Sequence, residues 1–211
     1  MSKQDLQLGY CTHEAARFAV RHWYHRPEMP IGRLVKIGVW YRDEFSGVLI
    51  FGRGASDSLG KRWGLTPLEV CELCRVALKP GHEFQVSRVL RVGVRLMRDV
   101  SPNIRAVVTF AEREHHGGIY QAAGWVYTGL TAPDRRYVDA SGVSHHSRGV
   151  SRSGWRKGIG GMSRCVRTTD CEAILVPGKH RFVLPLDNEM RERVQLFARP
   201  APARGELAPE A

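Results

Sequence analysis

Acidic residues are scarce in this chain of 211 residues. It has 21 Asp and Glu against 32 Lys and Arg, which gives a formal net charge of +11 at neutral pH. Such an excess of positive charge draws a soluble domain to polyanions, so nucleic acids and phosphorylated cofactors are the first partners to consider. Hydrophobic residues make up 43% of the chain, a globular share that excludes a wholly disordered or collagen-like protein.

Long apolar runs are also missing from the sequence. No stretch approaches the roughly 20 residues that a membrane-spanning helix needs, and the opening MSKQDLQLGY lacks the apolar segment of a secretory signal. We therefore expect a cytoplasmic protein without a membrane partner. The sequence does not indicate an oligomeric state.

The cysteines do not form an even set that could pair into disulfides. The five are Cys11, Cys71, Cys74, Cys165 and Cys171. An odd number without an export signal predicts reduced thiols. Cys71 and Cys74 have the CxxC spacing of a metal or redox site, but they lie in the apolar run VCELCRVAL and no second CxxC follows. We expect buried structural thiols, with a metal or redox role as the alternative.

The spacing of apolar residues predicts an alternation of strands and helices. Thr12 is a plausible N-cap of the first helix. The expected elements are helices at 12–24, 84–100, 118–123 and 188–198, and strands at 34–41, 47–51, 70–78, 104–110, 125–130 and 181–186. This order predicts an α/β (α+β) fold with a mixed central sheet flanked by helices.

Residues 131–169 interrupt this alternation. They are rich in Ser, Gly, Arg and His, offer little for a core, and carry eight basic side chains against two acidic ones, with Asp170 just beyond. We expect a basic loop insertion within a single domain spanning residues 1–198. The tail, residues 199–211, contains three prolines and is expected to be disordered.

The order of elements from Leu34 to Leu130 resembles the GCN5-related N-acetyltransferase (GNAT) fold. In that fold a central strand leads into a helix whose N-terminus holds the pyrophosphate of acetyl-CoA, and the stretch CELCRVALKPGHEFQVSRVL is similar to it. HHGGIYQAAGWVYTGL resembles the second signature of the fold. The glycine-rich pyrophosphate motif is missing, since only Gly81 stands before Ser87.

A closer resemblance is to the Mom family of phage DNA-modification proteins. It extends over roughly residues 15–186 and rests on these blocks in the same order: WYHR, GRLVKIGVW, GVLIFGRGAS, CELCRVAL, VSR, TFAE, HHGGIYQAAGW and KHRFVLPL. The resemblance implies a divergent GNAT fold and an enzyme that converts adenine in phage DNA to its N6-carbamoylmethyl form, which blocks host restriction. The functional positions it implies are Tyr24, His25, Arg75, Ser87, Glu112 and Tyr120. The family more often has Asp at the position of Glu112.

Two of these positions are candidate bases. Glu112 follows an apolar strand, at the carboxyl end where α/β sheets usually bind ligands. We predict that it removes a proton from adenine N6, while the alternative is a surface carboxylate paired with Arg113. His25, beside Tyr24, is a second base or a metal ligand, or else a solvated histidine.

Other positions are candidates for the donor side. Arg75 lies in an apolar strand, where an unpaired charge is costly, so it should meet a carboxylate such as Glu72 or a phosphate of a ligand. Ser87 is near a helix N-terminus, where it could face an anion or simply cap the helix. With Arg88 they are predicted to hold acetyl-CoA or a related donor.

Contacts with DNA are predicted from aromatic and basic residues. Adenine must leave the duplex to react, and stacking on an aromatic ring offsets that cost. The predicted stacking platforms are Trp23, Tyr24, Trp63 and Tyr120. Phosphates are expected to meet Arg148, Arg152, Arg156 and Lys157 of the basic insertion. The arginine stripe Arg88, Arg91, Arg95 and Arg98 is a weaker candidate, because a solvated helix face explains it as well.

A metal site has little support from the sequence alone. The resemblance implies a possible iron requirement, and the candidate ligands are His115, His116, His145 and His146. These histidines are adjacent in pairs, so the spacing does not place them on one helix face as ligands of one metal ion.

Two other functions stay open. One is a conventional acetyl-CoA-dependent N-acetyltransferase acting on a small amine or protein, and the other is a DNA-binding protein without catalysis.

Overall fold

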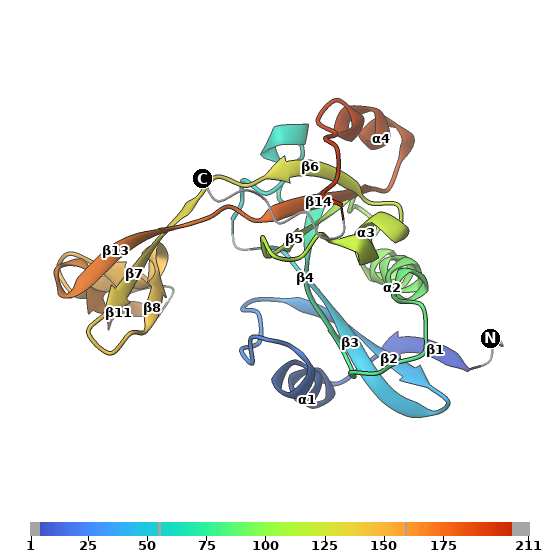
Figure 1. Ribbon diagram of the computed structural model, residues 1–211, viewed down its shortest axis with the longest axis horizontal. Helices are drawn as coiled ribbons and strands as arrows, with labels where there is room; N and C mark the ends of the chain where they lie inside the picture. The colour runs from blue at the N-terminus through green and yellow to red at the C-terminus, as the bar shows by residue number, and fades with distance from the viewer. Residues whose placement is uncertain (1–4, 55, 159, 204–211) are drawn as a thin grey trace. The chain divides into compact units, whose positions relative to one another are not determined.

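A seven-stranded mixed sheet forms the larger of the two units into which the chain divides (Figure 1). The computed structural model describes residues 5–54, 56–158 and 160–203. Unit 1 consists of the described residues up to 129 and from 180 onward, and unit 2 consists of residues 130–179. Within the described ranges, no helix is both long enough and apolar enough to cross a membrane.

The strands of the central sheet follow the order β1-β2-β3-β4-β5-β14-β6. They are β1 (Leu6–Tyr10), β2 (Leu34–Tyr41), β3 (Glu44–Gly52), β4 (Val70–Leu78), β5 (Ala106–Ala111), β14 (His180–Pro185) and β6 (Val126–Leu130). Strands β1 to β4 pair antiparallel, β4 and β5 pair in parallel, and β5 and β14 pair antiparallel. This mixed sheet confirms the predicted fold class.

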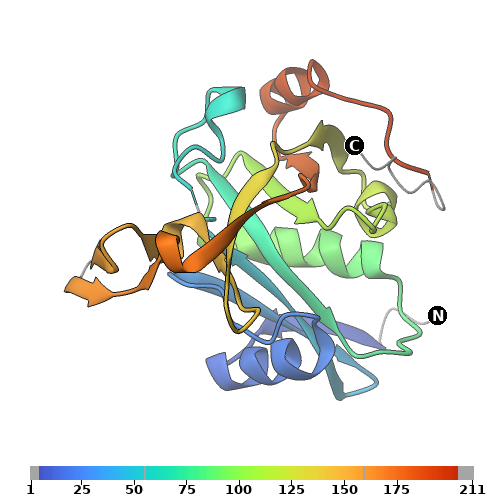
Figure 2. The same ribbon diagram turned by 60° about the vertical axis from the view of Figure 1, so that its left-hand side comes forward.

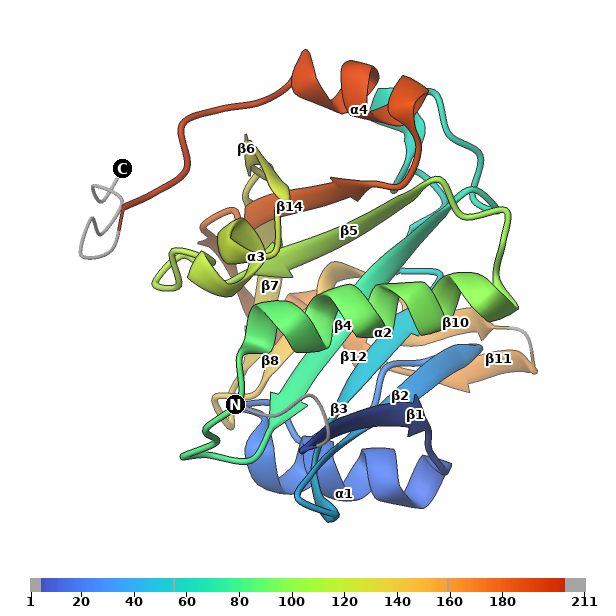
Figure 3. The ribbon, with the colours of Figure 1, turned by 90° about the vertical axis from the view of Figure 1, so that its right-hand side faces the viewer.

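Helices cover both faces of the sheet because its strands are apolar on both sides. The helices are α1 (His13–Trp23), α2 (Val86–Val100), α3 (Gly118–Ala122) and α4 (Asn188–Gln195), with a 3₁₀ turn η1 (Lys61–Trp63). In β3, Leu49 packs in one cluster with Leu90 of α2, whereas Val48 and Ile50 pack with Ala16 of α1. Alternate residues of a strand point to opposite faces, so α1 and α2 lie on opposite sides of the sheet (Figure 3).

Helix α2 lies unusually close to the sheet at Gly93. A Cβ atom at this position would lie 2.2 Å from Cδ1 of the buried Leu49. The glycine in the apolar stripe of this helix therefore lets the helix backbone approach β3. Figure 2 shows β4 running along the sheet and its chain turning back into α2, so the start of α2 lies near the end of β4.

Most predicted elements are found within a few residues of their expected bounds. Thr12 caps α1, since its hydroxyl accepts from the amide of Ala15 over 3.2 Å. The turn between β2 and β3 contains Arg42 and Asp43, both with positive φ (51° and 62°), as the tight turn of a hairpin requires. The sequence does not predict β1, whose alternation is short and half exposed.

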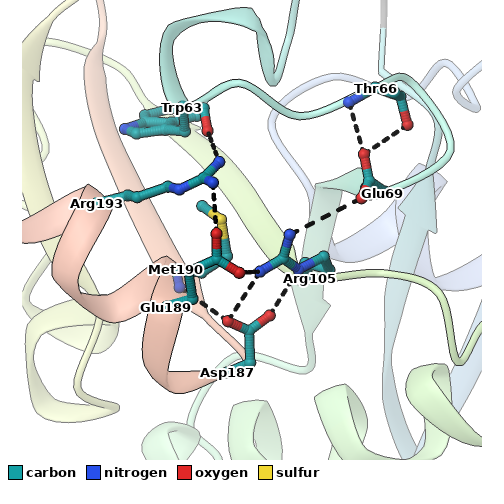
Figure 4. Close-up of polar contacts among 8 residues, drawn as sticks. All are labelled: Trp63, Thr66, Glu69, Arg105, Asp187, Glu189, Met190 and Arg193. Carbon is teal, nitrogen blue, oxygen red and sulfur yellow. Dashed lines mark hydrogen bonds and ion pairs between the residues drawn. The ribbon is translucent and has the colours of Figure 1, made fainter.

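The helix α4 is fastened to the sheet by Arg105, at the start of β5 (Figure 4). Its guanidinium donates to Asp187 over 2.8 and 3.2 Å and to Glu189 over 2.6 Å. Asp187 is also the N-cap of α4 and accepts from the amide of Met190 over 2.8 Å. Glu189 pairs in turn with Arg193, which donates to the Trp63 carbonyl over 3.1 Å. This network joins η1, β5 and α4.

Unit 2 contains the expected basic insertion, but its residues form short strands where a loop is predicted. The strands are β7 (Asp134–Asp139), β8 (Ser144–His146), β9 (Val150–Ser151), β10 (Trp155–Gly158), β11 (Gly161–Arg164), β12 (Val166–Arg167) and β13 (Cys171–Val176), with 3₁₀ turns η2 (Ser147–Gly149) and η3 (Thr168–Asp170). They pair as β13-β7-β8, β10-β11 and β12-β9. Val150 is the one hydrophobic side chain buried among the described residues of this unit. Main-chain hydrogen bonds between the paired strands stabilise unit 2. Because these bonds do not depend on a buried apolar face, the spacing of hydrophobic residues does not predict the strands.

The predicted disordered tail, residues 199–211, lies mostly outside the described residues. In the described part, the amide of Arg199 donates to the carbonyl of Tyr127 in β6 over 2.9 Å.

Candidate functional site

Strands β4 and β5 stop pairing partway along their length. Among the described residues, their parallel ladder joins only Val70–Glu72 to Ala106–Val108. Just past the ladder, the Thr109 hydroxyl donates to the Leu73 carbonyl over 3.0 Å. Figure 3 shows the two strands diverging toward their carboxyl ends. A space therefore opens in the middle of the sheet, where an α/β sheet usually binds its ligand.

A β-bulge in β4 lies beside this space. Ile50 of β3 pairs with Arg75, but the next residue, Phe51, pairs with Leu73, so Cys74 is the extra residue. Bulges of this kind redirect the side chains that follow them and are common next to active sites.

The bulge decides which face of the sheet Arg75 occupies. Before it, Leu73 packs in the core on the α2 side; after it, Val76 packs there and Ala77 packs on the α1 side. Arg75 shares the face of Ala77 because both are odd-numbered positions after the bulge. Its guanidinium carbon consequently lies over the Tyr24 ring at the end of α1, 5.0 Å from the centroid.

The other contacts of Arg75 are with main-chain oxygens. It donates to the carbonyl of Cys74 over 2.8 Å and to that of Glu28 over 3.4 Å. The sequence predicts a carboxylate such as Glu72 or a ligand phosphate as its partner. Carbonyl dipoles and an aromatic face carry only partial charges, so the guanidinium can still bind a full anion of a ligand.

The space between the strands is a cavity of about 760 Å³, within the usual range of small-molecule sites. Its walls come from the corner after α1, the bulge of β4, the first turn of α2, the end of β5, and the chain around α3. The lining residues that bear on function are Tyr24, His25, Arg75, Ser87, Glu112 and Tyr120. The structure thus brings together all six positions that the resemblance implies.

Glu112 lies directly after β5 and has a partner that the sequence does not predict. Its carboxylate accepts from Arg26 over 2.6 Å, and the two side chains are 22% and 46% exposed. The pair joins the corner after α1 to the end of β5. Because a guanidinium stabilises the carboxylate form, Glu112 is held ready as a charged hydrogen-bond acceptor.

The rings of Tyr24 and His25 lie against each other, with centroids 4.2 Å apart. Burial raises the pKa of Tyr24, against the opposing effect of Arg75. Burial also lowers the pKa of His25, and the neighbouring Arg26 lowers it further. His25 is therefore a neutral imidazole at neutral pH, able to accept a proton, and its side chain is exposed.

Tyr120 closes the cavity from α3. Its ring packs against Trp125 and Phe182 with centroid distances of 5.5 and 5.3 Å. Burial raises its pKa, although a hydrogen bond with Thr109 acts in the opposite direction. The phenol is therefore protonated at neutral pH and can donate.

Gly117 shapes the turn that precedes Tyr120. It is the N-cap of α3 and has φ of +66°, and a Cβ there would lie 2.3 Å from the Phe182 ring. Only glycine combines this left-handed backbone with such a close approach. Gly117 of HHGGIY is therefore needed by the turn itself.

The first turn of α2 forms another wall. The N-cap is Gln85, which makes no side-chain capping bond, and Ser87 lies inside the helix and lines the cavity. The capping role considered for Ser87 is therefore wrong. Amide groups at a helix N-terminus favour an anion. Arg88, predicted beside Ser87, is half-buried and lies outside the lining of the cavity.

The cysteines of the CxxC sequence are structural. All five cysteines are free thiols. Cys71 is buried against the sulfur of Met97 at 3.9 Å, and burial raises its pKa. Burial also raises the pKa of Cys74 to about 12. Neither is a thiolate at neutral pH, so neither is a ready nucleophile or metal ligand.

Of the four predicted stacking platforms, Trp63 lies away from the cavity. It is 3% exposed and packs in the core with η1 and α4, because its indole fills the space over β5 and β14. Tyr120 is 9% exposed, and the ring of Tyr24 is covered by Arg75. Within the corner, His25 is the exposed ring.

The four candidate metal-binding histidines belong to two different units. His115 and His116 line the cavity, whereas His145 and His146 belong to unit 2, where they pair with Asp139 (2.6 Å) and Asp134 (3.6 Å). The described residues include no group of three or more His, Cys, Asp or Glu side chains able to hold a metal ion. The donor set seen here therefore does not fit iron.

The predicted DNA-binding residues belong to unit 2. Arg152, Arg156 and Lys157 are exposed, and the side chain of Arg148 lies outside the described part of the structure. On α2, Arg91 donates to the carbonyl of Ala122 at the end of α3 over 3.2 Å. One member of the arginine stripe therefore has a structural role.

Arg26 is the functional candidate that sequence reasoning missed. It directly follows His25 in the block WYHR. A cation in a block that already contains two implied functional positions was the available signal. Its partner Glu112 is 86 residues away, so the pairing depends on the tertiary structure.

Comparisons with solved structures find acetyltransferases. The putative acetyltransferase yncA from Salmonella typhimurium, solved with acetyl-CoA, is 15% identical with a TM-score of 0.47, and the match covers 88% of this chain and 96% of that one. A Bacillus subtilis acetyltransferase in complex with CoA is 12% identical with a TM-score of 0.46, covering 87% and 99%. The aminoglycoside acetyltransferase AAC(6')-Ib, in complex with coenzyme A and kanamycin, is 12% identical with a TM-score of 0.48, covering 90% and 99%.

No curated protein matches the chain. A family model gives the informative result, since the model of the Mom protein family matches residues 5–203. That range contains both units and every residue of the cavity. The chain therefore belongs to the Mom protein family.

Proposed function

We propose that this protein is a DNA-modifying enzyme that converts adenine to its N6-carbamoylmethyl form. The observation that carries the proposal is the convergence of Tyr24, His25, Arg75, Glu112 and Tyr120 on one cavity. They come from four separate segments of a chain that belongs to the Mom family. Modification of this kind in phage DNA would protect it from host restriction.

The cavity has the size and chemistry to take a base out of the duplex. An enzyme that acts on N6 must work on a flipped or single-stranded adenine, because the duplex hides that atom. A volume of about 760 Å³ can hold a purine together with part of a donor. The Glu112 carboxylate is available to accept one hydrogen bond from the N6 amino group, and the exposed imidazole of His25 is available to accept the other.

We assign the removal of the N6 proton to His25. As the N6–carbon bond forms, one proton must leave N6, and a neutral imidazole accepts it. Its lowered pKa keeps His25 neutral, whereas Arg26 stabilises the charged form of Glu112. Glu112 therefore orients the amino group. A base of this kind contributes about 10²–10⁴-fold to the rate.

The donor side of the cavity is formed by Arg75, Ser87 and the start of α2. The guanidinium and the first-turn amides of α2 suit an anionic donor, which fits acyl-CoA or a related molecule. Because the new bond joins N6 to the methylene carbon of the carbamoylmethyl group, the donor would carry that methylene on a leaving group such as a thiol. Attack on the thioester carbonyl of acetyl-CoA would instead give N6-acetyladenine. Protonated Tyr120 is placed to donate a proton to the departing group as its bond to the transferred carbon breaks.

DNA itself is the partner that the charge of the chain predicts. The net charge is +11, and Arg152, Arg156 and Lys157 are exposed in unit 2. A transferase for a small amine needs no such positive surface. We assign the phosphate contacts to unit 2 and the chemistry to unit 1.

The test is mass spectrometry of nucleosides from DNA of cells that express the protein. We expect N6-carbamoyl-methyl-deoxyadenosine with the wild type and at least a 100-fold loss with His25→Gln. Glu112→Gln should lower the yield as well. Glu114→Gln is the matched control, since Glu114 is exposed and only two residues from Glu112.

The same experiment distinguishes the two other functions. N6-acetyl-deoxyadenosine, which lacks the carbamoyl NH2 group, or acetylation of small amines without any DNA product, would indicate a conventional N-acetyltransferase. Unmodified deoxyadenosine alone, with the protein folded and bound to DNA, would indicate a DNA-binding protein without catalysis. Either result would refute the proposal.

A further inference from the structure

The hairpin formed by β10 and β11 in unit 2 is exposed along its whole described length. Each residue of Trp155–Gly158 and Gly161–Arg164 is exposed. Among the described residues, the two strands form ladder pairs only with each other. An isolated two-stranded ribbon buries too little surface to be stable by its own packing. A ribbon that leaves Trp155 52% and Met162 62% exposed is suited to bury them against a partner.

The register of the hairpin gives its two faces different chemistry. Trp155 lies opposite Arg164, and Lys157 lies opposite Met162. Because residues two apart in a strand share a face, these four side chains form one face, which we call the ribbon face. It alternates apolar and cationic groups. The opposite face carries Arg156 and Ser163.

The charge around the ribbon identifies the kind of partner. From residue 140 to residue 169 the chain has no Asp or Glu, and it has six Arg and Lys residues. These are Arg148, Arg152, Arg156, Lys157, Arg164 and Arg167. An acid-free segment of this length favours a polyanion over a protein surface of mixed charge.

A hollow at the base of the hairpin adds a second cationic feature. It has a volume of about 490 Å³ and is lined by Trp155, Arg164 and Arg167, with Asp170 as its acidic member. Arg167 lies across Gly154, where a Cβ would be 3.1 Å from its Cγ and Nε atoms. The hollow is thus lined by two arginines and a tryptophan, a composition that suits a phosphate next to a base.

We propose that the ribbon face enters a groove of duplex DNA, with Trp155 and Met162 against the bases and Lys157 and Arg164 toward the phosphates. The inference rests on the proposed function in taking DNA as the partner. A two-stranded ribbon fits the major groove, which is about 12 Å wide, since paired strands lie about 5 Å apart. Lys157 and Arg164 on the ribbon face and Arg156 on the opposite face then contact the phosphates of the two DNA strands.

The experiment measures binding of the full chain to a short duplex of mixed sequence and to its single strands. Trp155→Ala should weaken duplex binding by roughly 5- to 100-fold, the effect of losing one contact with base edges in the groove. Its salt dependence should be unchanged, because no charge is lost. Lys157→Gln with Arg164→Gln should lower the slope of log affinity against log salt by about 2.

Two variants control for folding, and a third compares the two apolar side chains of the ribbon face. Leu175→Ala removes an exposed apolar side chain of the same unit, 69% exposed on β13 and outside the hairpin, and should bind like the wild type. Trp155→Phe should retain most of the affinity. Met162→Ala should weaken binding less than Trp155→Ala. Tryptophan emission should change on duplex addition in the wild type, and this change should be smaller in Trp155→Phe.

Wild-type affinity of Trp155→Ala would overturn the inference, and so would equal binding of duplex and single strands. The measurement uses neither donor nor turnover, so its failure is separate from failure of the proposed function. If Trp155→Ala binds normally while nucleoside analysis still finds the modified adenine, the ribbon inference alone is wrong. If the wild type binds through the ribbon but leaves adenine unmodified, the proposed function alone is wrong.

Discussion

The two units of the chain are stabilised in different ways. In unit 1, strands such as β3 are buried on both faces between helices, and the side chains with chemistry line a gap in that packed sheet. In unit 2, β10, β11 and most of β13 are exposed, and main-chain pairing supplies the order. Position within unit 1 is set by packing, so its functional groups are held in place. Unit 2 presents exposed cationic side chains and the exposed indole of Trp155 on short pairs of strands.

The difference separates two kinds of functional residue. His25, Glu112 and Arg75 depend on neighbours from distant segments, so small changes in packing should alter them. Arg152, Arg156 and Lys157 of unit 2 face solvent, so they should be replaceable without unfolding the chain. Four predictions follow from this contrast.

The largest effect is expected from the charges of unit 2. Replacing Arg152, Arg156 and Lys157 together by Gln should weaken DNA binding on the order of 100-fold at physiological salt and reduce the salt slope by about 3. The free energy of unfolding should stay within about 0.5 kcal/mol. Binding titrations at several salt concentrations and urea unfolding measure the two quantities.

The control for this triple variant removes the same charge from unit 1. Arg17, Arg21 and Arg95 are exposed on α1 and α2, and their replacement by Gln should leave most of the affinity. An equal loss in both triple variants would show that net charge, and not unit 2, governs binding.

Packing in unit 1 can be tested at Gly117. Gly117→Ala should lower the free energy of unfolding by roughly 1–3 kcal/mol, because the left-handed backbone is strained with a Cβ and the methyl group meets the Phe182 ring. Gly149→Ala in unit 2 is the matched control, since a Cβ there meets nothing within 4 Å. Chemical unfolding of the two variants should separate them clearly; similar stability would contradict the packing described here.

The anchor of α4 should have a smaller effect. Asp187→Ala should cost about 1–2 kcal/mol of stability at neutral pH, because Asp187 caps α4 and accepts from Arg105. The hydrogen bond from Arg105 lowers the pKa of Asp187. Its contribution is therefore complete above the ordinary carboxyl pKa and is lost as pH falls through the lowered value in the folded state. Thermal unfolding from neutral to acidic pH should show the gap between wild type and variant closing.

The most subtle test concerns the pH dependence of the reaction. His25 must be neutral to accept a proton, so activity should fall as pH decreases through its pKa, which lies below the ordinary histidine value. Arg26→Gln removes one cause of that lowering and leaves Glu112 without its guanidinium, and both effects raise the pKa of His25. The acid limb of the pH–activity profile should move to higher pH, and an unmoved limb would exclude His25 as the base.

Much of unit 1 was predictable because its hydrophobic pattern is strong. The apolar stripe of α2 and the doubly buried β5 are features of local sequence, and the resemblance over several blocks predicted which residues gather at the cavity. Trp63 shows the limit: a tryptophan in a Gly- and Ser-rich loop suggests exposure, yet it packs under α4 because Arg193 and its neighbours draw that helix over it. The strands of unit 2 were missed because main-chain hydrogen bonds leave little trace in the order of side chains.

The amino-acid sequence by itself determined the positive charge, the alternation of strands and helices, and membership of the Mom protein family. The tertiary structure decided which face Arg75 occupies, because a bulge at Cys74 reverses the alternation of β4. It also decided that Arg26 meets Glu112 and that Trp155 shares a face with Met162. These outcomes depend on register and on contacts between distant segments, and no local pattern of residues encodes either one.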